Sequence, residues 1–159
     1  MSRITRYLPI AVLAIGVVSL VVGIVFVAEA QIKSNWMKNE MRQEKITLGL
    51  DANAIARGDI VDDAAEAQKA GDTIRGHRHS IAPTYNDLLG GQPFDPSNPT
   101  QVKYMQALNL ENYLYLSVLG FGVTKVVLVT GIVMIIVGIA LGTTGLLMFR
   151  LRKAPVAGV

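Results

Sequence analysis

Two histidines separated by one residue are the feature of this sequence most suggestive of chemistry. His77 and His79 lie in the basic run 75–79 and are the only histidines of the chain. Two imidazoles bind zinc or copper when both rings converge on one ion. On a regular helix, side chains at i and i+2 point about 200° apart, so convergence requires a loop. A metal site at His77 and His79 is therefore an alternative to a basic helix end that stabilises the helix dipole or contacts an anion.

The rest of the sequence carries no pattern typical of an active site. The chain has no cysteine, which excludes disulfides and thiolate ligands for zinc or iron–sulfur clusters. It contains no nucleophile elbow, zinc-protease helix, phosphate-binding loop or dinucleotide fingerprint. We therefore expect a non-catalytic protein without a cofactor.

Two uncharged apolar runs, at residues 8–28 and 126–149, determine the fold class. A helix of about 20 apolar residues crosses a bilayer core about 30 Å thick. We predict transmembrane helices at 7–29 and 126–149. Residues 28–30 resemble the cleavage site of a signal peptide, but the apolar region of a signal peptide spans about 7–15 residues. An uncleaved anchor is therefore the favoured interpretation of the first run.

The net charge of +3 comes from the two ends of the chain. The tails 1–6 and 150–159 carry +2 and +3, whereas residues 30–112 carry −2. Positive charge next to a span marks its cytoplasmic side, and a nucleic-acid partner is not expected. We predict a protein of the plasma or inner membrane, with both tails cytoplasmic and residues 30–112 extracytoplasmic.

The extracytoplasmic segment is predicted to be helical, so the whole chain is an all-α membrane protein. We expect helices over about 31–56, 59–79 and 99–119, and a loop rich in proline and glycine at 81–98. An interfacial helix is expected at 113–125, with a bend at 120–122. Aromatic residues and lysine anchor helices at membrane surfaces. The predicted anchors are Trp36, Tyr113, Tyr115, Phe121 and Lys125.

Small residues form one face of each predicted span. They are Gly16, Ser19 and Gly23 in the first span, and Gly131, Gly138, Gly142 and Gly145 in the second. Because lipid gives helices no hydrophobic reason to associate, small residues permit the close packing that holds spans together. The pattern leaves open whether each face packs on the other span or on another protein. Neither apolar run, 8–28 or 126–149, contains a charged residue, which disfavours a transport pathway.

These observations favour an accessory or scaffold subunit of a larger membrane complex. Its partners would be the lipid bilayer and either other membrane subunits or further copies of itself, contacted through the glycine faces and the outer helices. A ligand-binding or sensory module that acts through a partner is the alternative. A metal-handling role for His77 and His79 is the third hypothesis.

Overall fold

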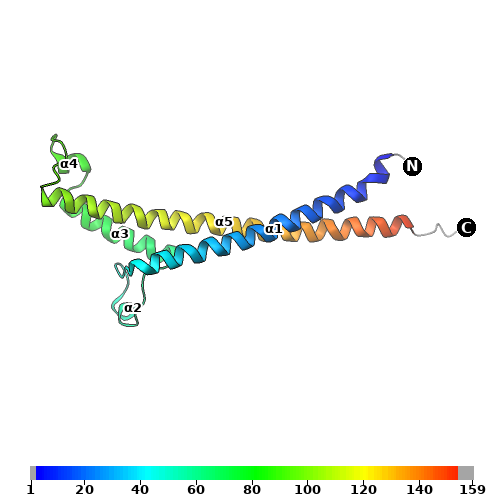
Figure 1. The fold of residues 1–159 in the computed structure, drawn as a ribbon, viewed down its shortest axis with the longest axis horizontal. Coiled ribbons are helices and arrows are strands. Elements are labelled where there is room, and N and C mark those ends of the chain that lie inside the picture. The colour runs from blue at the N-terminus through cyan, green and yellow to red at the C-terminus, as the bar shows by residue number, and fades with distance from the viewer. Residues whose placement is uncertain (1–2, 154–159) are drawn as a thin grey trace, which may run out of the picture. The chain divides into compact units, whose positions relative to one another are not determined.

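The computed structural model describes residues 3–153, and over these residues the chain is entirely helical. The elements are α1 (Arg3–Glu44), α2 (Ala52–Ala56), α3 (Ala64–Ile81), α4 (Tyr85–Leu89) and α5 (Pro99–Lys153) (Figure 1). No strand occurs in this part of the chain. The all-α prediction is therefore confirmed for the described residues.

The chain divides into two compact units. The span unit comprises residues 1–32 and 124–159, and the middle unit comprises residues 33–123. The two long helices, α1 and α5, each contribute residues to both units.

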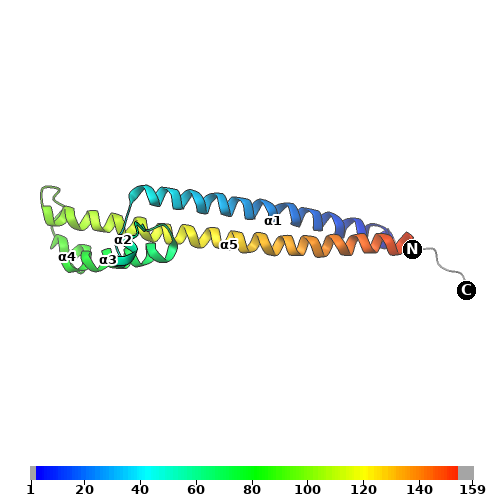
Figure 2. The same ribbon diagram turned by 90° about the horizontal axis from the view of Figure 1, so that it is seen from below.

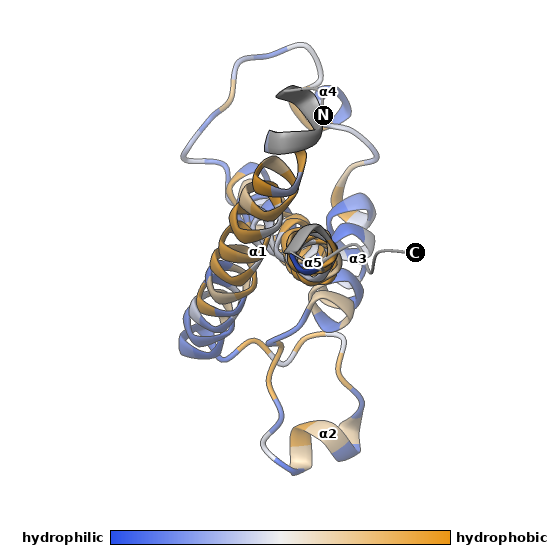
Figure 3. Cartoon of the chain, turned by 90° about the vertical axis from the view of Figure 1, so that its right-hand side faces the viewer, coloured by the Kyte–Doolittle hydropathy of each residue, from blue (hydrophilic) through white to orange (hydrophobic). Residues whose placement is uncertain are grey.

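Both long helices contain a segment apolar and long enough to cross a membrane. In each, only 11% of the most apolar 18-residue window is buried, whereas the core helix of a soluble protein is mostly buried. Figure 3 shows α1 changing from hydrophobic residues near its start to hydrophilic residues at its far end. Two such helices are compatible with the predicted membrane protein.

The middle unit has a small core between the end of α1, the helix α3 and the first part of α5. α3 lies beside α5 in two perpendicular views (Figures 1 and 2). The buried core residues are Met41, Val61, Ala67, Ala70, Leu114 and Phe121. Two of the six are alanines, so the helices approach closely but bury little apolar area, and apolar burial stabilises by about 25 cal/mol per Å².

The first outer helix ends earlier than the sequence predicts. A single helix over 31–56 was expected, but α1 ends at Glu44 and the separate helix α2 follows. Lys45 has a φ of 50° and Gly49 a φ of 80°, so the backbone turns out of the helix there. The N–H of Val61 then donates to the carbonyl of Ile46 at 2.8 Å. Packing of this returning segment on the core overrides its helical pattern.

The second outer helix begins five residues later than predicted. The predicted helix starts at Asp59, but α3 starts at Ala64, where the carboxylate of the N-cap residue Asp63 accepts from the N–H of Glu66 at 2.9 Å. Asp59 instead pairs with Arg57 at 2.8 Å. Between α3 and α5, the segment expected as a loop contains the short helix α4, which ends at Gly90 in the left-handed conformation.

Residues 99–153 form one continuous helix, so the helix is not broken at the predicted bend 120–122. The predicted interfacial helix at 113–125 is accordingly a part of α5. Gly120 has another role: a Cβ added there would lie 2.6 Å from the sulfur of Met37. The glycine therefore allows the side chain of Met37 to approach α5 and does not break the helix.

Candidate functional site

The glycines of the two spans meet inside the span unit. A Cβ added to Gly138 would lie 2.7 Å from the nitrogen of Leu20 and 2.8 Å from the carbonyl oxygen of Gly16. One added to Gly23 would lie 2.7 Å from the carbonyl oxygen of Gly131. These distances are too short for any side chain, so the two helices touch backbone to backbone.

The buried residues of the span unit recur every seven positions along each helix. On α1 they are Pro9, Gly16, Gly23 and Ala30, and on α5 they are Gly131, Gly138 and Gly145. Ser19, the third member of the predicted small face of α1, is half-buried. A strict seven-residue repeat along two packed helices favours a left-handed supercoil.

Gly142 is the glycine whose environment differs from the prediction. A Cβ added at Gly142 would meet nothing within 4 Å, although its backbone lies against Gly16. At Gly145, by contrast, an added Cβ would lie 3.0 Å from the nitrogen and Cβ of Leu13. The contact on α5 therefore follows the spacing of seven through Gly131, Gly138 and Gly145, more than the local G-x-x-x-G pair.

A buried ion pair joins α3 to α5 in the middle unit. The Nε of Arg78 donates to Glu111 at 2.7 Å, and its Nη2 donates to the other carboxylate oxygen at 3.4 Å. Arg78 also donates to the hydroxyl of Tyr104, and its guanidinium lies 5.0 Å from the centre of that ring. All three side chains are buried. The hydrogen bond from Arg78 to Glu111 raises the pKa of the arginine, so Arg78 is charged at any physiological pH.

The two histidines are not brought together. Both lie inside α3, where residues two apart point to different sides. His79 places Nε2 3.1 Å from Nη2 of Arg78, which disfavours an additional cation there. No group of three potential ligands able to hold a metal occurs among residues 3–153. The geometry therefore gives the metal hypothesis no support.

The predicted membrane anchors have different surroundings. Phe121 is buried in the core of the middle unit. The hydroxyl of Tyr115 donates to Asp72 of α3 at 2.7 Å, and Arg75 lies over its ring. Tyr115 and Phe121 therefore hold helices together and are not free to act as anchors. Trp36, Tyr113 and Lys125 are exposed, as an anchoring role requires.

The hydrogen bond between Tyr115 and Asp72 shifts the pKa values of both side chains. It is the main cause that lowers the pKa of Asp72, and the amide of Gln68 lowers it further. Burial raises the pKa of the Tyr115 phenol, and the hydrogen bond to Asp72 adds to that effect.

The ring of Tyr115 can lie against α3 because Gly71 has no side chain. A Cβ added at Gly71 would be 2.9 Å from Cε1 of Tyr115.

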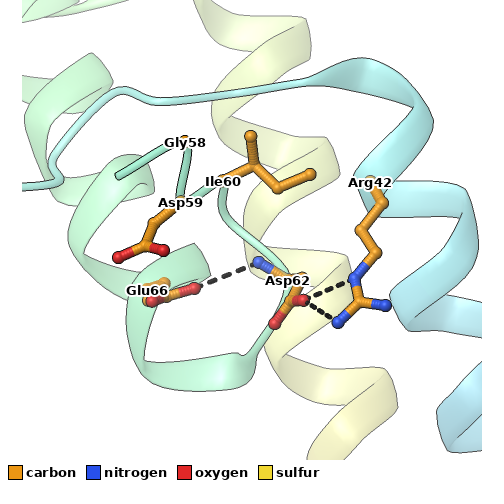
Figure 4. A pocket seen from close by; sticks show the side chains of 6 residues that line it. All are labelled: Arg42, Gly58, Asp59, Ile60, Asp62 and Glu66. Carbon is orange, nitrogen blue, oxygen red and sulfur yellow. Dashed lines mark hydrogen bonds and ion pairs between the residues drawn. The ribbon is translucent and has the colours of Figure 1, made fainter. Parts of the chain in front are cut away.

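A polar pocket of about 350 Å³ lies where the end of α1 meets the start of α3 (Figure 4). Arg42 bonds to Asp62 at 2.6 Å, and Glu66 accepts from the N–H of Asp62 at 3.1 Å. With Asp63 bonded to the N–H of Glu66, this arrangement resembles a capping box. Arg42, Asp62 and Glu66 are bonded to one another or to the start of α3, and Asp59 is paired with Arg57. We therefore assign the pocket a structural role.

Sequence reasoning missed the buried ion pair and the contact between Tyr115 and Asp72. The partners are 33 and 43 residues apart in the chain, so no local pattern relates them. A carboxylate at position 111 between apolar neighbours of one helix face is the signal that would have indicated a buried partner.

Comparison with family models, with curated proteins and with solved structures finds no match to this chain.

Proposed function

We propose that this chain is a non-catalytic two-span membrane protein that serves as an accessory or scaffold subunit of a larger membrane complex. The proposal is supported by an exposed apolar stripe on α5 within the middle unit. The stripe consists of Leu116, Leu119 and Val123, which are 66%, 62% and 55% exposed. Spacings of three and four place the three side chains on one helix face. A contiguous exposed apolar surface marks a site of contact with a partner or a membrane.

The glycine faces contribute to this function indirectly. Because they are used in packing α1 against α5 within the chain, they hold the two spans together and leave the branched apolar side chains facing outward. Ile15, Val18, Ile136 and Ile139 are among these outward side chains. We therefore assign docking to the apolar stripe and the outward faces of the spans.

The proposed topology follows from charge. Basic residues flank both apolar runs on their outer sides, so both tails are cytoplasmic and residues 30–112 are extracytoplasmic. The uncleaved-anchor interpretation is supported by α1, which continues without a break through residues 28–30. Removal of the first span would also expose the glycine face of the second to lipid.

Purification in mild detergent tests the proposed function. The full chain should elute with one or more larger membrane proteins in fixed stoichiometry. Replacing Leu119 and Val123 by glutamine should release the chain from them, because both substitutions place amides in an apolar contact. Ile55→Gln, which changes an exposed apolar residue of α2, is the matched control and should leave the complex intact. A wild-type chain that elutes alone as a monomer contradicts the proposal.

A further inference from the structure

An apolar groove lies between the end of α1 and α5 within the middle unit. It has a volume of about 440 Å³. Met41 is buried and therefore forms its inner part, whereas Trp36 is 59% exposed and flanks its opening. The full lining consists of Trp36, Met37, Glu40, Met41, Glu44, Tyr113, Leu116 and Ser117.

Two carboxylates line this groove without a counter-charge. Glu40 and Glu44 follow Trp36 at intervals of four residues, so the three side chains lie along one face of α1. Among the described residues, no basic side chain pairs with either of them. Arg42, on the same turn of α1, is bonded to Asp62 at 2.6 Å. Like charges one helix turn apart repel each other, so a bound cation would relieve an unfavourable interaction.

The charge of these carboxylates acts inside the groove. Burial raises the pKa of the Tyr113 phenol, and the negative charges of Glu44 and Glu40 raise it further. The negative potential of Glu40 and Glu44 that disfavours a phenolate at Tyr113 attracts a cation beside the same ring. Both carboxylates are exposed, so a cation can reach them from solvent.

We propose that this groove binds an organic cation that has an apolar body, with Glu40 and Glu44 balancing its charge. Trp36 and Tyr113 present aromatic faces that attract an ammonium group, and Met37 and Met41 adapt to the shape of an apolar body. A hydrated metal ion fits poorly, since magnesium and calcium require about six oxygen ligands. An anionic or neutral molecule would leave the two carboxylates unbalanced. The groove shares Leu116 with the apolar stripe of the proposed function, but the inference rests on the two carboxylates and the aromatic side chains, which are not part of that stripe.

The test uses tryptophan fluorescence, because Trp36 is the only tryptophan of the chain. The full chain in neutral detergent is titrated with tetrabutylammonium, and a saturable change in emission is expected. Replacing both Glu40 and Glu44 by glutamine should weaken binding at least about tenfold. Asp59→Asn removes an exposed acidic charge outside this groove and should change the affinity by less than about twofold. Tetramethylammonium, which has almost no apolar body, should bind more weakly than tetrabutylammonium.

Three results would overturn the inference. The first is an unchanged emission up to about 10 mM ligand, a concentration that corresponds to negligible affinity. The second is equal affinity of the wild type and the double variant for tetrabutylammonium. If the double variant loses helicity, the single variants Glu40→Gln and Glu44→Gln replace it, and an affinity equal to that of the wild type in both would overturn the inference. The third is a photo-crosslinker at Tyr113, which lines the groove but lies outside the apolar stripe, that captures a co-purifying subunit while tetrabutylammonium does not reduce the capture. That result would assign the groove to a basic helix of a protein partner.

Discussion

Adding one methyl group at Gly138 should separate the two spans, whereas adding it at Gly142 should not. In Gly138→Ala the new Cβ would lie 2.7 Å from the nitrogen of Leu20, and ordinary contact begins at 3.4 Å. The helices must therefore move apart by about 0.7 Å, because the obstructing atoms are backbone atoms. Overpacking of this kind typically costs about 1–3 kcal/mol. In Gly142→Ala the same atom enters open space.

The comparison of the two variants isolates the steric effect. Alanine favours a helix over glycine by about 1 kcal/mol, and this gain is common to both variants. Their difference should thus equal the overpacking cost, which corresponds to a roughly 5- to 150-fold change in the equilibrium between packed and separated spans.

The packing equilibrium can be followed by energy transfer between two labels. Because the chain contains no cysteine, Tyr7→Cys and Arg150→Cys provide unique attachment points near the ends of the two spans. Titration with SDS should separate the labels at a lower SDS fraction in Gly138→Ala than in Gly142→Ala. Gly142→Ala should resemble the parent protein or be slightly more stable.

Equal midpoints for the two alanine variants would refute the reasoning. That outcome would mean that the spans do not meet through the face that contains Gly16, Gly138 and Gly145. A midpoint lowered in Gly142→Ala alone would point instead to a helix contact centred on Gly142.

Three further predictions address topology, the buried ion pair and pH. With an impermeant maleimide added outside intact cells, Gln92→Cys should be labelled and Ala157→Cys protected; the reverse pattern would invert the topology. Glu111→Leu should destabilise the middle unit by about 3–5 kcal/mol because it leaves the charge of Arg78 buried, and adding Arg78→Met should restore most of the loss in thermal unfolding followed by circular dichroism. The folded-state pKa of Asp72 is lowered from 3.8, so its stabilising contribution is present above pH 3.8 and is lost as pH falls through the folded-state value. Thermal unfolding followed from about pH 5 to about pH 2 should show this loss, and Asp72→Asn should reduce it.

Local patterns predicted the two apolar helices but placed several boundaries wrongly. The apolar runs at 8–28 and 126–149 are long enough to indicate helices by themselves. The end of α1 at Glu44 depends on residues 46–61 folding back onto a core partly formed by α3, which a helical period along the chain does not reveal. Asp59 and Asp63 are chemically equivalent candidates for an N-cap, and only the packing of the helix that follows selects Asp63.

The glycines show most clearly what a pattern leaves undetermined. A face of small residues predicts close approach, but the same face can accept a helix of the chain or of a partner. In the structure this face packs against the other span of the same chain through the repeat Gly131, Gly138 and Gly145. Gly120 and Gly71 follow the same principle in the middle unit, where each admits a large side chain, Met37 and Tyr115 respectively. Glycines of α5 and α3 thus set the separation between helices in both units. The sequence alone does not show which helix packs against each glycine.

In the middle unit, small residues bring helices together without fixing their register. Ala67 and Ala70 of α3 are fully buried, yet methyl groups slide past one another with little change in buried area. The paired charges of Arg78 and Glu111 oppose such sliding. Displacing α3 by one turn would leave two buried ions without partners, and breaking such a pair costs about 3–5 kcal/mol. We infer that this ion pair sets the alignment of α3 on α5. The hydrophobic replacement Arg78→Met with Glu111→Leu should then preserve stability while allowing α3 alternative positions, visible as extra conformers in spin-label distance measurements between the two helices. A single sharp distance in that variant would assign the alignment to the alanine packing instead.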